Sequence, residues 1–121
     1  GIFNFESMYG ETEELFFVNH DYGGSYWDKS NAIAQRSYAN SPHRFVQKWN
    51  TPILIITGEY DFRIPYTQSL QAFTAARVRG LDSRLVVFEN EGHQVLQPQN
   101  SLTWNREFFS WLDKYVKNPA E

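Results

Sequence analysis

The chain has 121 residues, which is enough for one domain and too few for two. Its formal net charge is -3, which excludes the basic surface that binds nucleic acid or anionic membranes. It has no cysteine, hence no disulfide framework and no thiol nucleophile, and its histidines lack the spacing of metal ligands, so we expect neither metal nor cofactor. The composition does not indicate a cellular compartment.

Residues 1–50 are predicted to be an irregular helical segment. Thr12 is a favourable helix N-cap with two glutamates after it, and Ser41-Pro42 is typical of a helix start. Four short elements are expected: the end of a strand at Ile2, Phe3 and Phe5, and helices over residues 12–19, 31–36 and 41–46.

Residues 51–121 are predicted to alternate strand and helix. The two strand candidates are short apolar runs, as in a buried parallel sheet, and Gly80 is placed to end the helix between them. We expect strands over residues 53–57 and 84–88, and helices over residues 66–79 and from Pro98 onward. The last helix should pack across the sheet through a stripe of Leu102, Phe109, Leu112 and Val116, widened by Trp104, Phe108, Trp111 and Tyr115. This order predicts an α/β fold with parallel strands.

Asp61 and His93 each follow one of the predicted strands. They would therefore meet at the sheet edge where α/β folds keep their chemistry. An acid and then a histidine, each after a strand, is the order of the last two triad members in α/β-hydrolases. We interpret Asp61 as the residue that orients His93, and His93 as general base and then general acid. The alternative is a turn aspartate and a solvated loop histidine.

Three segments resemble one family of enzymes. S-M-Y-G-E-T-E-E-L, T-P-I-L-I-I-T-G-E-Y-D-F-R-I-P and E-N-E-G-H-Q-V-L-Q-P-Q-N-S are together similar to the C-terminal part of the catalytic domain of prolyl oligopeptidase family serine peptidases, in the dipeptidyl-peptidase and acylaminoacyl-peptidase branch. The resemblance spans nearly the whole chain. It implies that residues 1–121 are the C-terminal portion of an α/β-hydrolase fold, that the substrate is a peptide, and that Asp61 and His93 are the triad acid and base.

The triad nucleophile has no counterpart in this sequence. The family carries its serine in a G-x-S-x-G turn between a strand and a helix, and that motif does not occur here. Ser25 precedes Asp61 and His93 in the right order, but Trp27 stands where the second glycine should be. Because the family places the serine upstream of the segment that resembles residues 1–10, we expect it outside this chain. The chain alone is predicted to be inactive, since loss of a nucleophile costs on the order of a millionfold in rate.

Five further residues are implied in substrate binding by the resemblance: Phe5, Met8, Tyr9, Arg63 and Ile64. The first three would line the pocket for the side chain before the scissile bond, and Ile64 would lie beside that pocket. An aromatic pocket suits proline or a small apolar side chain. Two alternatives stay open, because the rings could be ordinary core and Arg63 could either bind a substrate carbonyl or brace its loop.

Two other functions fit the same features. An esterase or lipase-like hydrolase would use the same acid and base, since the pair serves any acyl transfer. A non-catalytic module could instead associate with itself, because a small sheet leaves unpaired strand edges. Those edges lead us to expect a homo-oligomer formed through them. No apolar run reaches the roughly 20 residues of a membrane span, so we expect no membrane partner.

Overall fold

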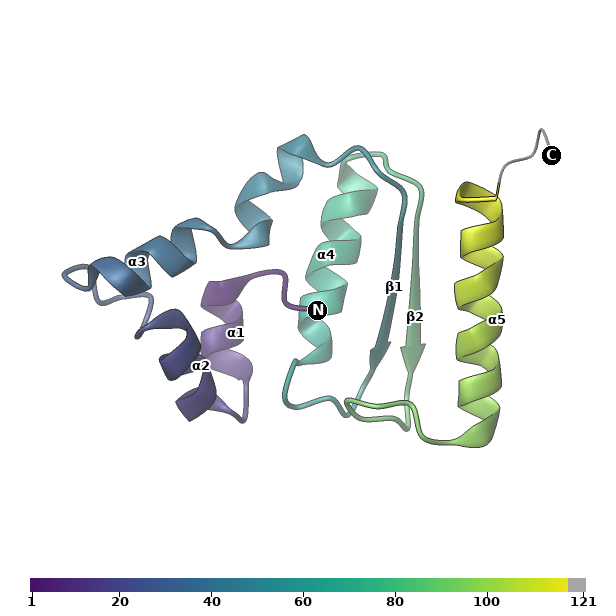
Figure 1. Ribbon diagram of the computed structural model, residues 1–121, viewed down its shortest axis with the longest axis horizontal. Helices are drawn as coiled ribbons and strands as arrows, with labels where there is room; N and C mark the ends of the chain where they lie inside the picture. The colour runs from purple at the N-terminus through teal and green to yellow at the C-terminus, as the bar shows by residue number, and fades with distance from the viewer. Residues whose placement is uncertain (118–121) are drawn as a thin grey trace.

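The computed structural model describes residues 1–117, in which a group of small helices lies beside a helix–sheet–helix sandwich (Figure 1). The elements in chain order are α1 (Phe5–Glu11), α2 (Leu15–Tyr22), α3 (Ala32–Ala39), the 3-10 helix η1 (Pro42–Lys48), β1 (Ile53–Gly58), α4 (Tyr66–Val78), β2 (Ser83–Phe88) and α5 (Pro98–Tyr115). None of the helices in this range is both long and apolar enough to cross a membrane.

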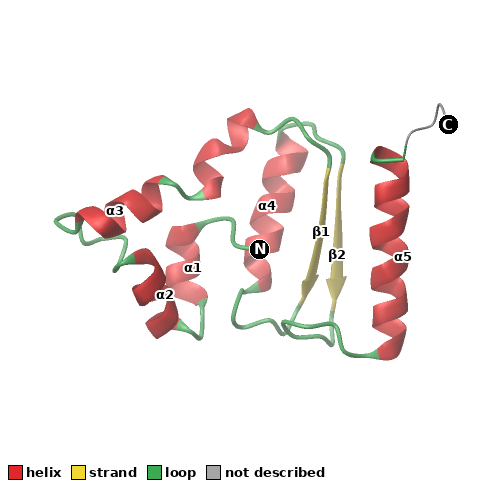
Figure 2. Cartoon of the chain, in the orientation of Figure 1, coloured by secondary structure: helices red, strands yellow, loops and turns green. Residues whose placement is uncertain are grey.

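Two parallel strands form the sheet of the described residues. β1 pairs with β2 from Ile53 opposite Ser83 to Gly58 opposite Phe88. α4 connects the strands and covers one face of the sheet, and α5 covers the other face (Figure 1). Because the strands are parallel, both end on the same side, where the loops that follow them lie together (Figure 2). The parallel pairing expected from the sequence is confirmed.

α4 packs on the sheet mainly through small side chains. Its buried residues are Gln68, Ser69, Ala72 and Ala76. The helix was predicted over residues 66–79 and ends one residue earlier. Gly80 follows with a φ of 76°, in the left-handed region that glycine adopts at little cost, so it closes the helix as expected.

α5 turns only part of its predicted apolar face toward the sheet. Leu102, Phe109 and Val116 of the predicted stripe are 72%, 57% and 72% exposed. The prediction was wrong for these three residues, because the apolar residues of this helix cover more of its circumference than one sheet can bury, and the large rings take the sheet side as predicted. The residues that share a hollow with β1 are Trp104, Phe108, Trp111 and Leu112.

The start of the chain is helical and not extended. The Oδ1 atom of Asn4 accepts the backbone N–H groups of Glu6 (3.1 Å) and Ser7 (3.3 Å), which satisfies two donors at the start of α1. Phe5 therefore begins a helix, and the strand predicted at this point was wrong.

Thr12 closes the turn between α1 and α2 instead of capping α2. Its hydroxyl accepts the N–H of Glu14 (3.0 Å) and donates to the carbonyl of Arg63 (2.8 Å). The predicted helix start was wrong, since α2 begins at Leu15. The same side chain ties the small helices to the loop after β1.

The best-buried apolar cluster lies among α1, α2 and α3, and consists of Met8, Val18, Tyr22, Ala34 and Tyr38. The residues of β1 from Ile53 to Thr57 are only half-buried. Full burial of a large apolar side chain contributes about 1.5–3 kcal/mol. In residues 1–117 the small helices therefore have a closed core of their own, whereas the sheet does not.

Candidate active site

The loops after β1 and β2 carry the two residues predicted to be catalytic. β1 ends at Gly58, opposite Phe88 of β2, and the N–H of Glu59 donates to the carbonyl of Phe88 (2.9 Å). The two loops therefore leave the sheet side by side. Asp61 lies in the first loop and His93 in the second, at the C-terminal ends of parallel strands, where α/β sheets place their functional groups.

Asp61 and His93 form a hydrogen-bonded pair. His93 Nδ1 lies 2.9 Å from Asp61 Oδ2. The other carboxylate oxygen, Oδ1, accepts the backbone N–H groups of Arg63 (3.2 Å) and Ile64 (3.0 Å), so both oxygens are held in place. The Asp61 side chain is 11% exposed and that of His93 is 46% exposed. A buried acid thus holds an accessible imidazole.

The hydrogen bond assigns the proton positions on His93. An ionised carboxylate can only accept, so Nδ1 carries the hydrogen donated to Asp61, and Nε2 of the neutral ring keeps a free lone pair. Nε2 can then take a proton from a hydroxyl and return it, while Asp61 stabilises the imidazolium formed in between. The pair has the parts that acid–base catalysis needs.

Gly58 allows the two loops to approach each other closely. A Cβ atom at Gly58 would collide with the carbonyl oxygens of Glu91 and Gly92, and backbone atoms cannot easily move away. The N–H of Tyr60 donates to the carbonyl of Glu91 (3.0 Å), which joins the two loops directly. The glycine was identified from the sequence only as the end of a strand, because the contact lies far away along the chain.

Glu91 holds the base of the His93 loop and was missed by the sequence analysis. Its side chain is buried, at 4% exposed. Its carboxylate accepts the N–H of Leu96 (3.2 Å) and that of Gln97 (3.2 Å to Oε2), just before α5 begins. An acidic residue a few positions before a proline-led helix start is a signal that could have found it.

The turn between α1 and α2 contacts the Asp61 loop and braces it. The N–H of Glu13 donates to the carbonyl of Phe62 (3.1 Å), and the Arg63 side chain forms a salt bridge with Glu14 (3.2 Å). Of the two roles considered for Arg63, these contacts match the bracing role.

Ile64 is the predicted substrate residue that lies beside the pair. It lines a hollow of about 490 Å³ together with Asp61, His93 and Trp104. The hollow is bordered by the ends of β1, the His93 loop and the start of α5. Whether Ile64 contacts a substrate there stays a prediction.

Phe5, Met8 and Tyr9 lie on α1 and do not line that hollow, but Ile64 packs against the same apolar cluster as these three residues. Met8 is 2% exposed and belongs to the helical core. Phe5 stacks on Tyr22 with ring centroids 4.7 Å apart, and Tyr9 meets Trp27 edge to face at 5.3 Å. Both rings stay partly exposed, so a substrate contact remains a prediction for them.

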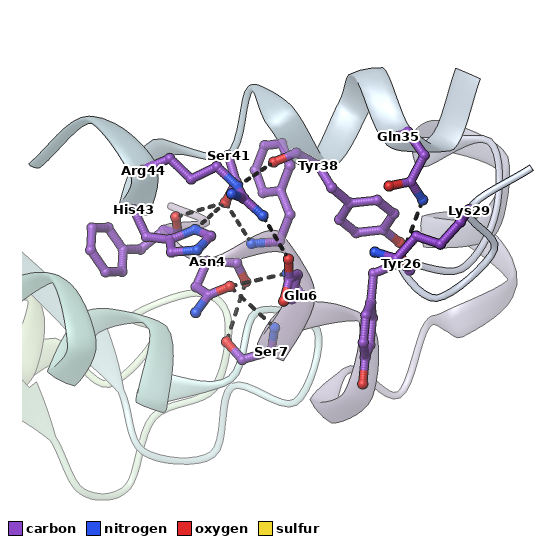
Figure 3. Close-up of polar contacts among 12 residues, drawn as sticks. Asn4, Glu6, Ser7, Tyr26, Lys29, Gln35, Tyr38, Ser41, His43 and Arg44 are labelled. Carbon is purple, nitrogen blue, oxygen red and sulfur yellow. Dashed lines mark hydrogen bonds and ion pairs between the residues drawn. The ribbon is translucent and has the colours of Figure 1, made fainter. Parts of the chain in front are cut away.

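Ser41 anchors the start of α1 (Figure 3). Its hydroxyl oxygen is fully buried, accepts the N–H of Phe5 (2.9 Å) and lies 2.6 Å from His43 Nδ1. Burial, together with the charge of Arg44, lowers the pKa of His43, so the ring is neutral and its Nδ1 can accept the Ser41 hydroxyl hydrogen. Ser41 is buried, His43 is half-buried, and Ser41 positions Phe5.

Gln68 links α4 to the same segment. Its Oε1 accepts the N–H groups of Phe3 (3.0 Å) and Asn4 (2.8 Å), and its Nε2 donates to Ser7 Oγ (2.8 Å). At 1% exposed, it is a buried amide whose hydrogen-bonding groups are all directed at the start of α1. α4 begins just after the Asp61 loop, so Gln68 fixes α1 relative to the acid.

Three further observations bear on the chemistry. No group of three or more His, Asp or Glu side chains is placed to hold a metal among residues 1–117. Burial raises the pKa of Tyr22 to about 12 and also raises that of Tyr38, so both phenols stay protonated. Ser25 lies in the turn between α2 and α3, with no hydrogen bond to His93 in the described part of the chain.

The fold and the Asp–His pair define the C-terminal portion of an α/β-hydrolase. Acylaminoacyl peptidase of Pyrococcus horikoshii matches with a TM-score of 0.80 and 18% identity, over 98% of this chain and 20% of that one. An acylaminoacyl peptidase in complex with Z-Gly-Gly-Phe-chloromethyl ketone matches with a TM-score of 0.81 and 18% identity, over 100% of this chain and 20% of that one. At this identity the likeness shows the fold.

The chain belongs to the prolyl oligopeptidase family, whose model matches residues 1–119. Dipeptidyl-peptidase 5 of Porphyromonas gingivalis is 54% identical over 117 residues, which are 97% of this chain and 17% of that protein. Dipeptidyl-peptidase 5 of Schizosaccharomyces pombe is 39% identical over 118 residues, 98% of this chain and 17% of that protein. The family expected from the three sequence segments is confirmed, and the chain spans about 17% of the length of these relatives.

Proposed function

We propose that this chain is the acid and base portion of a longer serine peptidase that cleaves short peptides. The observation that carries the proposal is the 2.9 Å hydrogen bond between His93 Nδ1 and Asp61 Oδ2, at the ends of neighbouring parallel strands. The relatives named dipeptidyl-peptidases support a peptide as substrate. The nucleophilic serine would come from outside residues 1–121, because no G-x-S-x-G occurs here.

In the reaction, His93 Nε2 takes the proton of the serine hydroxyl as its oxygen attacks the scissile carbonyl carbon. The imidazolium, held by Asp61, then gives that proton to the leaving amine, and an acyl-enzyme remains. Water repeats the sequence: His93 accepts a proton from it, the acyl bond breaks, and the proton returns to the serine. Asp61 stays ionised throughout and keeps the ring in the tautomer that can accept.

The test uses the full-length protein and a chromogenic dipeptidyl amide. Asp61→Asn and His93→Ala should each lower kcat by about 10⁴-fold or more. A matched control is the exposed pair His20 and Asp21, 3.6 Å apart on α2, whose replacement by Ala and Asn should leave kcat unchanged. Full activity in either Asp61→Asn or His93→Ala would refute the assigned roles.

The same assay separates peptidase from esterase. Turnover of simple acyl esters without turnover of dipeptidyl amides would assign the pair to an esterase. The isolated chain of 121 residues should cleave neither substrate, because it lacks the nucleophile motif.

A further inference from the structure

Glu91 is a buried acid two residues before His93. It is 4% exposed, and it takes part in none of the salt bridges among residues 1–117. A buried carboxylate is unfavourable unless hydrogen bonds or an opposite charge compensate the loss of water. The hydrogen bonds of Glu91 therefore indicate what its charge does in this loop.

The Glu91 carboxylate binds the far end of the His93 loop. Its Oε1 accepts the backbone N–H of Leu96 (3.2 Å), and its Oε2 accepts that of Gln97 (3.2 Å). Gln97 is the N-cap residue of α5, and its own side chain caps no N–H group of the helix. The carboxylate thus lies at the N-terminal end of α5, where the helix dipole favours a negative charge.

The Glu91 backbone binds the loop that carries the acid. Its carbonyl oxygen accepts the N–H of Tyr60 (3.0 Å), the residue directly before Asp61. One residue is therefore bonded to the Asp61 loop through its backbone and to the start of α5 through its side chain.

His93 lies in the part of the loop that this side chain closes. Residues 92–95 lie between Glu91 and the two N–H groups that its carboxylate accepts. A segment fixed at both ends has fewer conformations than one fixed at a single end. The closed loop therefore limits how far the His93 ring can move from Asp61, whose Oδ2 lies 2.9 Å from His93 Nδ1.

We propose that Glu91 is a positioning residue, whose negative charge closes the His93 loop onto the start of α5 and so holds His93 Nε2 where it exchanges protons. The inference rests on the function proposed above and assigns no chemical step to Glu91 itself. Charge matters here more than size. A glutamine of the same size would keep one oxygen and turn an NH₂ group, which only donates, toward a backbone N–H.

The placement of His93 matters more for one leaving group than for another. When the C–N bond of an amide breaks, the amine must receive a proton from His93, whereas a nitrophenolate leaves an ester without one. A displaced imidazole should therefore slow the amide more than the ester. A smaller fraction of folded enzyme would instead slow both by the same factor.

The test compares a dipeptidyl nitroanilide with the nitrophenyl ester of the same dipeptide, in the full-length protein. Glu91→Gln should lower kcat for the amide by about 10- to 100-fold, because a displacement of about 1 Å costs on the order of 100-fold. KM should stay near the wild-type value, and kcat for the ester should fall less. Glu89→Gln makes the same change of charge at an exposed side chain and should change neither rate.

Two variants at Gln97 test the hydrogen bond without altering Glu91. The φ of Gln97 is −73°, which proline adopts, so Gln97→Pro removes the donor N–H and keeps this backbone angle. Gln97→Ala removes the same side chain and keeps the N–H. The amide-to-ester ratio of kcat should therefore be lower in Gln97→Pro than in Gln97→Ala.

The outcomes separate this proposal from the proposed function. A wild-type amide-to-ester ratio in Glu91→Gln overturns the positioning role, even if both rates fall. Equal ratios in Gln97→Pro and Gln97→Ala overturn it as well, and this pair decides alone if circular dichroism shows that Glu91→Gln does not fold. Full activity in His93→Ala would instead refute the proposed function.

Discussion

The small helices of residues 1–48 and the sandwich of residues 53–115 are built in opposite ways. The helices enclose a core in which Met8 is 2% and Tyr38 is 3% exposed, yet they contain neither Asp61 nor His93. The sandwich holds the acid–base pair on a sheet whose first strand is only half-buried from Ile53 to Thr57. In residues 1–117 the best-buried apolar core and the candidate acid–base pair thus lie in different parts of the chain.

Hydrogen bonds connect the two parts at the Asp61 loop and at α4. Thr12 and Glu13 bind backbone carbonyls of that loop, and Gln68 of α4 binds the start of α1. The helices can therefore hold the acid in place from the side, although they contribute no residue to the pair. One substitution in the small helices, one in the sandwich and one at the connection between them test this division of roles.

The largest effect should come from opening the helical core. Met8→Ala should lower the free energy of unfolding of the small helices by about 2–5 kcal/mol, because it removes buried methylene groups and leaves a cavity. Hydrogen exchange resolved by segment in the full-length protein measures this. Ile33→Ala on α3 is the control, since Ile33 is 68% exposed and should change the free energy little. Equal protection in Met8→Ala and the wild type would contradict a core centred on α1.

In the sandwich, Gly58→Ala should separate the two loops. The added Cβ meets the carbonyl oxygens of Glu91 and Gly92, so the His93 loop must shift. A displacement of about 1 Å in a catalytic group costs on the order of 100-fold in rate, and we expect that loss in kcat against a dipeptidyl amide. Gly10→Ala is the control, because no atom lies within 4 Å of its added Cβ. Wild-type kcat in Gly58→Ala would show that the close approach is not needed.

Gln68→Met should break the hydrogen bonds that connect α4 of the sandwich to the start of α1. The substitution keeps the volume but leaves the N–H groups of Phe3 and Asn4 without their acceptor, at a cost of about 1–3 kcal/mol. Faster hydrogen exchange in α1, together with a raised KM, is the expected result. Gln47→Met, at an exposed position of η1, should change neither quantity. A loss of stability confined to α4 would show that Gln68 does not connect the two parts.

The smallest effect should be a pH dependence at the start of α1. The pKa of His43 is lowered from 6.5, chiefly by burial, so the folded chain binds this proton less tightly than the unfolded chain. The stability that neutral His43 provides is present above pH 6.5 and is lost as the pH falls through the lowered pKa. A protonated Nδ1 can no longer accept the hydrogen of Ser41.

We expect the Phe5 amide to lose protection from hydrogen exchange as the pH falls, once intrinsic exchange rates are taken into account. His43→Phe should remove that dependence, and His20→Ala, at a side chain 86% exposed, should keep it. The same slope in wild type and His43→Phe would assign the pH dependence to another group.

Much of the sandwich could be predicted from the sequence because its signals are local. The short apolar runs end at glycine or at a turn, Pro98 marks a helix start, and Gly80 marks a helix end. The pairing of Asp61 with His93 followed from parallel strands, since such strands end at one edge.

The predictions from sequence were wrong or incomplete where the local structure depends on residues far away along the chain. Phe3 and Phe5 alternate as in a strand, but Asn4 caps α1, and the N–H groups of Phe3 and Asn4 are held by Gln68, which lies 65 and 64 residues away in the sequence. The buried face of α5 could not be chosen without knowing where the sheet lies. The role of Gly58 arises from two loops meeting, which no local pattern records.

The direct bonding of the two loops at their bases has a consequence for evolution. Tyr60, Phe62 and Leu96 stand on the outer sides of these loops and are 58%, 58% and 75% exposed. Substitutions of these side chains leave intact the backbone hydrogen bond from Tyr60 to Glu91 and the close approach at Gly58. Substitutions of the rim side chains can therefore accumulate without breaking the contacts that position Asp61 beside His93.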